Sequence, residues 1–116
     1  SIERWSDLAS QARTHLSRHG ITNVDIHVGD GSLGLSEVAP FDAVLVSAAF
    51  PEVPVPLARQ LRDGGRLVQP IGPGGNEMVT LYRRTEGRLN RVRAVVPAYF
   101  VRLTGQEAFD ELDPDG

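Results

Sequence analysis

The chain has 116 residues, of which 12 are basic and 15 acidic, and its formal net charge of −3 gives no general attraction to nucleic acid or anionic lipid. No apolar run approaches the roughly 20 residues needed to cross a bilayer. The chain has no cysteine, which excludes disulfides, thiolate zinc ligands and cysteine nucleophiles within these residues. A chain of this length suits one globular domain, because it can bury roughly 65% of its unfolded surface.

The first residues predict the end of a strand followed by an amphipathic helix. Ser1 and Ile2 are expected to be a strand stump. The apolar residues that follow are spaced to share one helix face: Trp5, Leu8, Ala9, Ala12 and Leu16. Gly20 is placed to end that helix. Because the chain opens without Met, we interpret it as part of a longer sequence, so the lack of a signal peptide says nothing about targeting.

Two strands joined by a loop are expected next. Residues 24–28 alternate apolar and polar side chains, which is typical of a strand, and one helical turn is expected within the loop at 35–38. Residues 43–47 form a short apolar run bounded by polar turns, which predicts a parallel strand buried on both faces. The order of strand, connection and strand favours the late part of a doubly wound α/β sheet.

A short helix and another strand follow. Three prolines open the helix: Pro51, Pro54 and Pro56. Leu57 and Leu61 lie one helical turn apart, and the Asp63-Gly64-Gly65 turn is expected to close the helix. The next strand is predicted at residues 66–71.

The last third of the chain predicts a hairpin and a tail. Residues 78–84 and 89–96 are expected to pair as antiparallel strands across a turn at Glu86-Gly87. A final extended piece covers residues 99–103. The acidic stretch from 106 to 116 is expected to be a disordered tail.

Two acidic residues at strand ends are the main candidates for a ligand site. Glu3 follows the strand stump, and Asp30-Gly31 follows residues 24–28. Ligands of open α/β sheets bind outside the carboxyl ends of the strands, so Glu3 would hold a ribose while Asp30 and the Gly31 backbone meet a purine edge. Each has a plainer interpretation: Glu3 as a charge near a helix start, and Asp30-Gly31 as a common turn pair.

The remaining polar candidates favour structural interpretations. His15 and His19 are four residues apart on a helix, but no third ligand is evident, so no metal site is predicted. His27 fits the polar face of a strand. Ser47 lacks the glycines of a nucleophile elbow, and the loop 72–76 lacks the Lys-Ser or Lys-Thr of a P-loop. Five hairpin arginines are interpreted as a solvated edge that discourages strand aggregation: Arg83, Arg84, Arg88, Arg91 and Arg93.

Six ordered runs of residues resemble the protein-L-isoaspartate O-methyltransferase family. They are Ser-Ile-Glu-Arg at 1–4, Val-Gly-Asp-Gly at 28–31, Ala-Pro-Phe-Asp-Ala at 39–43, Ala-Ala-Phe-Pro at 48–51, Leu-Arg-Asp-Gly-Gly-Arg-Leu-Val-Gln-Pro-Ile-Gly-Pro at 61–73, and Phe-Val-Arg-Leu-Thr-Gly at 100–105. The resemblance covers the chain up to about Gly105, and we treat residues 1–105 as the C-terminal part of a methyltransferase domain. The family's glycine-rich loop and its Ser-containing substrate loop would lie upstream.

The resemblance implies a fold, a cofactor and an activity. The fold would be α/β, a Rossmann-like class I S-adenosylmethionine-dependent methyltransferase whose partial doubly wound sheet ends in an antiparallel hairpin. The activity would be methyl transfer from S-adenosylmethionine to the carboxylate of L-isoaspartyl or D-aspartyl residues in damaged proteins, and the protein would be cytoplasmic. Neither nucleic acid, membrane nor metal is expected as a partner.

The resemblance also implies roles for particular residues. The cofactor would be held by Glu3 at the ribose, by Asp30 and Gly31 at the adenine, and by Thr104 in the segment that closes over it. Arg4 is also implied as a cofactor-binding residue. The isoaspartyl peptide groove would be lined by the main chain of the residues before Thr104: Phe100, Val101, Arg102 and Leu103. Arg102 stands where the family usually has proline. No catalytic side chain is assigned.

Two other functions stay open. A carboxyl methyltransferase acting on a peptide natural-product precursor would share the cofactor-binding residues, and Arg102 would suit its different acceptor. A non-catalytic remnant could serve as a binding or structural module. For the isoaspartyl methyltransferase we expect the 116 residues by themselves to bind S-adenosylmethionine weakly or not at all and to be inactive, because the central strand of such a sheet would be missing.

Overall fold

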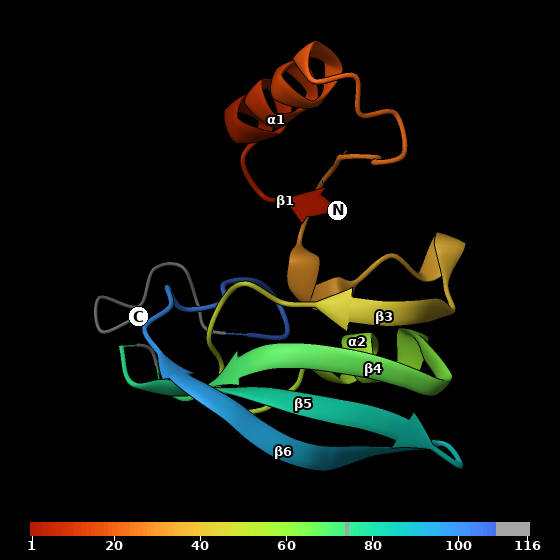
Figure 1. The fold of residues 1–116 in the computed structure, drawn as a ribbon, viewed down its shortest axis with the longest axis vertical. Coiled ribbons are helices and arrows are strands. Elements are labelled where there is room, and N and C mark those ends of the chain that lie inside the picture. The colour runs from red at the N-terminus through yellow and green to blue at the C-terminus, as the bar shows by residue number, and fades with distance from the viewer. Residues whose placement is uncertain (74, 109–116) are drawn as a thin grey trace. The chain divides into compact units, whose positions relative to one another are not determined.

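The computed structural model describes residues 1–73 and 75–108. These residues form two compact units, one from Ser1 to Gly31 and one that begins at Ser32. The strands form two sheets, β1-β2 in the first unit and β3-β4-β5-β6 in the second (Figure 1). Helices and parallel strands alternate before the final hairpin, so the fold is α/β with a mixed sheet, as predicted. Among the described residues, no helix has the length and apolar character to span a membrane.

The first unit holds one helix and a short parallel pair of strands. β1 (Ile2–Glu3) pairs in parallel with β2 (His27–Val28), with Glu3 opposite Val28. The predicted strand stump is therefore confirmed. The strand predicted at 24–28 is confirmed only at its last two residues. A strand extends only where a neighbouring strand supplies partners for its backbone hydrogen bonds. β1 has two residues, so β2 pairs with it over two residues.

The predicted N-terminal helix is confirmed as α1 (Ser6–Arg18). Gly20, with φ of 67°, follows its end, as expected of a helix-terminating glycine. Of the predicted apolar face, Ala9 is buried, whereas Trp5 is 60% and Leu8 48% exposed. The Arg13 guanidinium donates to the Ile26 carbonyl at 2.7 Å and ties the helix to the segment that leads into β2.

The predicted short turn after β2 is confirmed as the 3₁₀ helix η2 (Ser36–Val38), and a second one, η1 (Gly31–Leu33), precedes it. β3 (Phe41–Leu45) then pairs in parallel with β4 (Leu61–Ile71). The connection between these strands contains α2 (Val55–Gln60), which has a proline in its first turn, as predicted.

The end of α2 differs from the prediction. The helix ends at Gln60, and Leu61 already belongs to β4, where it pairs with Phe41. The expected Asp63-Gly64-Gly65 turn therefore lies inside β4. The pairing register between β3 and β4 shifts at this point. Phe41 pairs with Leu61, and the next pair joins Ala43 to Arg66. The turn-forming residues make a bulge in the strand rather than a helix terminus.

The predicted hairpin is confirmed. β5 (Glu77–Thr85) is antiparallel to both β4 and β6 (Arg88–Ala98). Glu86 and Gly87 connect β5 to β6 with φ values of 52° and 77°. Two successive positive φ angles are the signature of the tight turn whose twist matches a β-hairpin.

The core of the second unit lies between α2 and the sheet. Its buried centre consists of Leu57, Leu61 and Leu67, and partly buried side chains pack around them: Val44, Val46, Val53, Tyr82 and Leu89. The prediction that the 43–47 strand is buried on both faces is wrong, since Leu45 is 76% exposed. Among the described residues β3 has β4 as its one strand neighbour, so one edge and one face of β3 lack cover.

Candidate functional site

The two predicted acidic residues follow adjacent parallel strands. Glu3 is the last residue of β1, and Asp30 comes two residues after the end of β2. The Gly29 amide donates to the Glu3 carbonyl at 3.0 Å, which continues the parallel ladder and sets the start of the Asp30-Gly31 turn. Both acids and Gly31 are partly buried. The predicted placement of Glu3 and Asp30 at the carboxyl ends of neighbouring strands is therefore confirmed.

The Glu3 side chain also has a local structural contact. The Trp5 amide donates to Glu3 Oε1 at 3.2 Å, at the start of α1. Near a helix start a carboxylate is electrostatically favoured, so part of the plainer interpretation of Glu3 holds as well. A carboxylate has about four acceptor positions, which leaves capacity for ligand hydroxyls. The neighbouring Arg4 guanidinium lies 6.0 Å from the centre of the Trp5 ring.

The predicted substrate-lining segment runs extended beside the chain that follows β3. The Ala49 amide donates to the Val101 carbonyl, and the Leu103 amide donates to the Ala49 carbonyl, both at 2.7 Å. Arg102 thereby pairs in parallel with Ala49, which itself is fully buried. The extended conformation predicted for this part of the chain is confirmed at this bridge.

Thr104 belongs to the second unit and is partly buried. The segment after it is held in place, because the Glu107 amide donates to the Ser32 hydroxyl at 3.1 Å. Ser32 is fully buried at the centre of η1. The predicted tail begins at residue 106, and its part from 109 to 116 lies outside the described residues.

Two buried polar residues in the second unit did not emerge from the sequence. Gln69 is fully buried on β4, and its amide donates to the Glu52 carbonyl at 2.9 Å. Glu77 is 1% exposed at the start of β5, and its Oε2 accepts the Phe100 amide at 3.3 Å. An acid in the loop before a predicted strand looks solvated in the sequence. The one feature of the sequence that could have indicated burial is that Glu77 directly precedes the apolar residues of the predicted strand.

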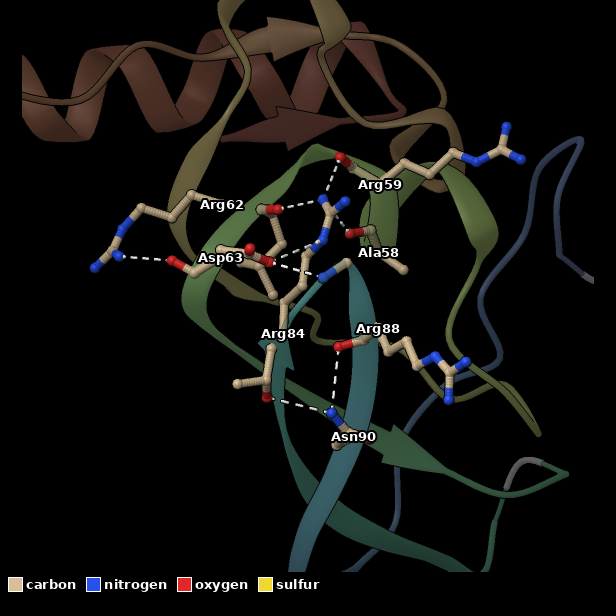
Figure 2. Close-up of polar contacts among 10 residues, drawn as sticks. Ala58, Arg59, Arg62, Asp63, Arg84, Arg88 and Asn90 are labelled. Carbon is tan, nitrogen blue, oxygen red and sulfur yellow. Dashed lines mark hydrogen bonds and ion pairs between the residues drawn. The ribbon is translucent and has the colours of Figure 1, made fainter.

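An arginine cluster joins the hairpin to the end of α2. Figure 2 shows the Arg84 guanidinium between the last carbonyls of the helix and the Asp63 carboxylate. Arg84 Nη1 donates to the Arg59 carbonyl at 2.8 Å and the Leu61 carbonyl at 2.6 Å. Asp63 Oδ1 accepts the Gly87 amide at 3.1 Å. The cluster is a helix C-terminal cap, because these carbonyls lack partners within the helix.

An open hollow of about 370 Å³ lies next to this cluster. Its lining includes Val53, Ala58, Tyr82 and Leu89. Burial raises the pKa of Tyr82 above its ordinary value, and the Arg91 guanidinium partly offsets the effect. Charged side chains line the hollow as well, among them Glu52, Arg59 and Arg84. It includes no residue predicted to bind a cofactor or substrate, so we assign no ligand to it.

Three residues that were given structural interpretations lie at the surface. His15 and His19 are exposed at the end of α1, and Ser47 is exposed after β3. Within residues 1–73 and 75–108, no cluster of three or more His, Asp or Glu side chains is arranged to hold a metal ion.

A family model, curated relatives and solved structures each match most of this chain. Residues 1–108 match the family described as protein-L-isoaspartate(D-aspartate) O-methyltransferase. A protein-L-isoaspartate O-methyltransferase of Methanoculleus marisnigri is 46% identical over 107 residues, which are 91% of this chain and 48% of that protein. A Koribacter versatilis protein of the same name is 42% identical over 109 residues, which are 94% of this chain and 49% of that protein. The chain thus spans about half the length of these curated relatives.

Solved structures agree. A protein-L-isoaspartate O-methyltransferase matches 93% of this chain and 34% of its own, with a TM-score of 0.80 and 26% identity. A Plasmodium falciparum structure, described as a β-aspartate methyltransferase in complex with S-adenosyl-L-homocysteine, matches 89% of this chain and 50% of its own, with a TM-score of 0.69 and 25% identity. The predicted resemblance is confirmed, and this chain belongs to the protein-L-isoaspartate (D-aspartate) O-methyltransferase family.

Proposed function

We propose that the protein containing this chain transfers a methyl group from S-adenosylmethionine to the carboxylate of L-isoaspartyl or D-aspartyl residues in damaged proteins. The observation that carries the proposal is the parallel pairing of β1 with β2, which puts Glu3 and Asp30 at adjacent strand ends. Family membership over residues 1–108 supports it. The fold would be the Rossmann-like class I methyltransferase fold, and the location cytoplasmic.

The residues of the first unit fit the polar groups of this cofactor. Glu3 and Asp30 supply carboxylate acceptors, which suit ribose hydroxyls and an adenine amino group, and Gly31 leaves its backbone accessible to a planar base. Arg4 adds a charged donor beside them. A relative in this family has S-adenosyl-L-homocysteine bound, which supports the same ligand class here. We assign Thr104 to the segment that closes over the cofactor.

The chemistry explains why no catalytic dyad is needed. When bound, S-adenosylmethionine supplies an activated methyl group. The acceptor is a side-chain-type carboxylate with a pKa of about 4, so it is ionised at neutral pH and needs no general base. Alignment of that oxygen with the methyl group, with water excluded, supplies most of the rate enhancement.

The substrate groove would use the extended segment of the second unit. Phe100, Val101, Arg102 and Leu103 would line it, because the bridge to Ala49 holds their backbone extended, the conformation that main-chain recognition of a peptide requires. The isoaspartyl carboxylate would then be presented by contacts to the peptide backbone rather than by one side chain.

A chimera tests the proposal. This chain would replace the matching 107-residue segment of the Methanoculleus protein, to which it is 46% identical. We expect methylation of an isoaspartyl peptide and none of the matched aspartyl peptide. Glu3→Gln should weaken binding of S-adenosylhomocysteine about tenfold, because a hydrogen bond from a ribose hydroxyl to a charged acceptor is weakened. Glu86→Gln, in the exposed hairpin turn, is the matched control.

A folded chimera that methylates neither peptide would contradict the proposal. Equal methylation of both peptides would instead favour a carboxyl methyltransferase with another peptide acceptor. One observation favours examining that case: Arg102 Nε donates to the Pro73 carbonyl at 2.6 Å, a contact that the family's usual proline cannot make. If Glu3→Gln does not change the affinity for the cofactor, Glu3 does not bind the cofactor, and its role is structural, through the bond to the Trp5 amide.

A further inference from the structure

The segment proposed to line the peptide groove is held by a side chain at the start of β5 as well as by backbone groups. On one side it is bridged to Ala49. Two further contacts hold it. The Pro73 carbonyl, in the connection between β4 and β5, accepts from Arg102 Nε, and the carboxylate of Glu77, the first residue of β5, accepts the Phe100 amide.

Glu77 is unusual among these contacts because it is a buried acid. It is 1% exposed, and its Oε1 has no hydrogen-bond partner among the residues that the structure describes. Burying a carboxylate is costly unless it is hydrogen-bonded. The Phe100 amide, at 3.3 Å from Oε2, is the bond that the described structure gives it. A carboxylate buried at this cost for one backbone amide indicates that the position of that amide matters.

The space around Glu77 is closed on the side of Gly72. A Cβ atom on Gly72 would lie 3.1 Å from Glu77 Cγ and 2.9 Å from the Asn76 carbonyl oxygen. The Glu77 side chain is therefore packed against the Gly72 backbone, and its Oε2 faces the Phe100 amide.

We infer that Glu77 is a positioning residue for the peptide substrate, because its carboxylate holds the Phe100 amide and so sets where the groove-lining segment begins. This inference rests on the proposed function. It assigns Glu77 no contact with the reacting atoms. Loss of the carboxylate should affect recognition of the peptide and leave cofactor binding intact.

The test compares Glu77→Met with Glu77→Gln in the chimera described above. Methionine is flexible and of similar length, so it fills the space but cannot accept from Phe100. For Glu77→Met we expect the KM for the isoaspartyl peptide to rise about tenfold, the effect of losing one charge-assisted hydrogen bond. The kcat and the affinity for S-adenosylhomocysteine should stay within about twofold. Glu77→Gln keeps an acceptor oxygen and should restore most of the KM.

A second measurement does not depend on activity. Hydrogen exchange of the Phe100 amide should be slow in the parent and in Glu77→Gln, and faster in Glu77→Met. Glu86→Gln is again the matched control. An unchanged KM in Glu77→Met, or an equal loss of peptide and cofactor affinity, would overturn the inference about Glu77. The proposed function would still stand in that case, provided that the parent chimera is active. A parent without activity would contradict the proposed function and the inference with it.

Discussion

β3 and β4 are neighbouring parallel strands, and β3 has the larger share of apolar residues, yet β4 is the more buried of the two. β4 lies between β3 and β5, and Leu61, Leu67 and Gln69 on it are fully buried. β3 lies at the edge of the described sheet, and its Leu45 is 76% exposed. A strand this apolar at an edge is a site for pairing or aggregation. An apolar sequence is therefore not enough to bury a strand, because burial also requires neighbouring elements that cover it.

Leu67→Ala against Leu45→Ala tests this difference with the largest expected effect. Leu67 is in the core with Leu57 and Leu61, so its truncation should lower the free energy of unfolding by about 2–5 kcal/mol. Leu45→Ala should change it by less than about 0.5 kcal/mol, because little surface is removed from contact. Urea unfolding followed by far-UV circular dichroism measures both. Equal losses for the two variants would mean that the outer side of β3 is covered after all.

Arg84→Met tests how firmly the hairpin is attached beside β4. Arg84 donates to carbonyls at the end of α2 and is 25% exposed, so its loss should lower the unfolding free energy by about 2 kcal/mol. The matched control is Arg62→Met. Arg62 pairs with Asp42 at 2.6 Å, but the two side chains are 50% and 89% exposed, so the expected loss is below about 1 kcal/mol. Similar losses in the two variants would exclude the capping role.

Gly34→Ala and Gly20→Ala compare the two units at glycines with nearly equal φ, 66° and 67°. A Cβ on Gly34 would overlap Gln60 Oε1, whereas nothing lies within 4 Å of one on Gly20. Gln60 accepts the Leu35 amide at 2.7 Å and donates to the Leu33 carbonyl at 2.9 Å, so its displacement breaks two bonds. We expect a loss of about 1 kcal/mol for Gly20→Ala from its φ alone.

For Gly34→Ala the same backbone cost applies, and the displaced Gln60 adds about 1 kcal/mol more. Thermal unfolding of each variant against the parent gives the difference. If the two variants lose the same stability, the Gln60 side chain moves aside without cost. In a Gln60→Ala background Gly34→Ala should cost only its backbone term of about 1 kcal/mol, which isolates the contact.

Tyr82 gives the smallest expected effect, and it appears only at alkaline pH. Burial raises its pKa above 10.0, while Arg91 lowers it. Since the pKa is higher in the folded state, the folded protein favours the protonated phenol. The stabilisation is fully present below pH 10 and is lost as the pH rises through the folded pKa. The urea midpoint of Tyr82→Phe should therefore fall less than that of the parent above pH 10. Identical pH profiles would mean that Tyr82 is solvated.

Much of the fold was predictable because it is encoded locally. Proline in the first turn of α2, the Glu86-Gly87 turn and the helical spacing before Gly20 each specify an element through residues close in sequence. The strand ends that carry Glu3 and Asp30 were predictable for the same reason. The binding roles of Glu3, Asp30 and Thr104, and the weak cofactor binding expected of the isolated chain, stay predictions.

Contacts across long sequence separations were not predictable. Nothing near Asp63 in the sequence shows that it accepts from Gly87, and nothing near Glu77 shows that it accepts from Phe100. The helical spacing of Leu57 and Leu61 suggested one longer helix. Pairing with Phe41 takes Leu61 into β4 instead, because a backbone partner in a strand outweighs a weak helical preference.

The sequence by itself determined the order of elements, the hairpin turn, the two acids at strand ends and the family of the chain. These features depend on periodicity, turn chemistry and motifs that neighbouring residues carry. Only the tertiary structure decided that β3 is exposed, that Arg84 caps α2 and that Glu77 holds Phe100. The physical reason is that burial and hydrogen bonding of a polar group depend on which distant partner reaches it.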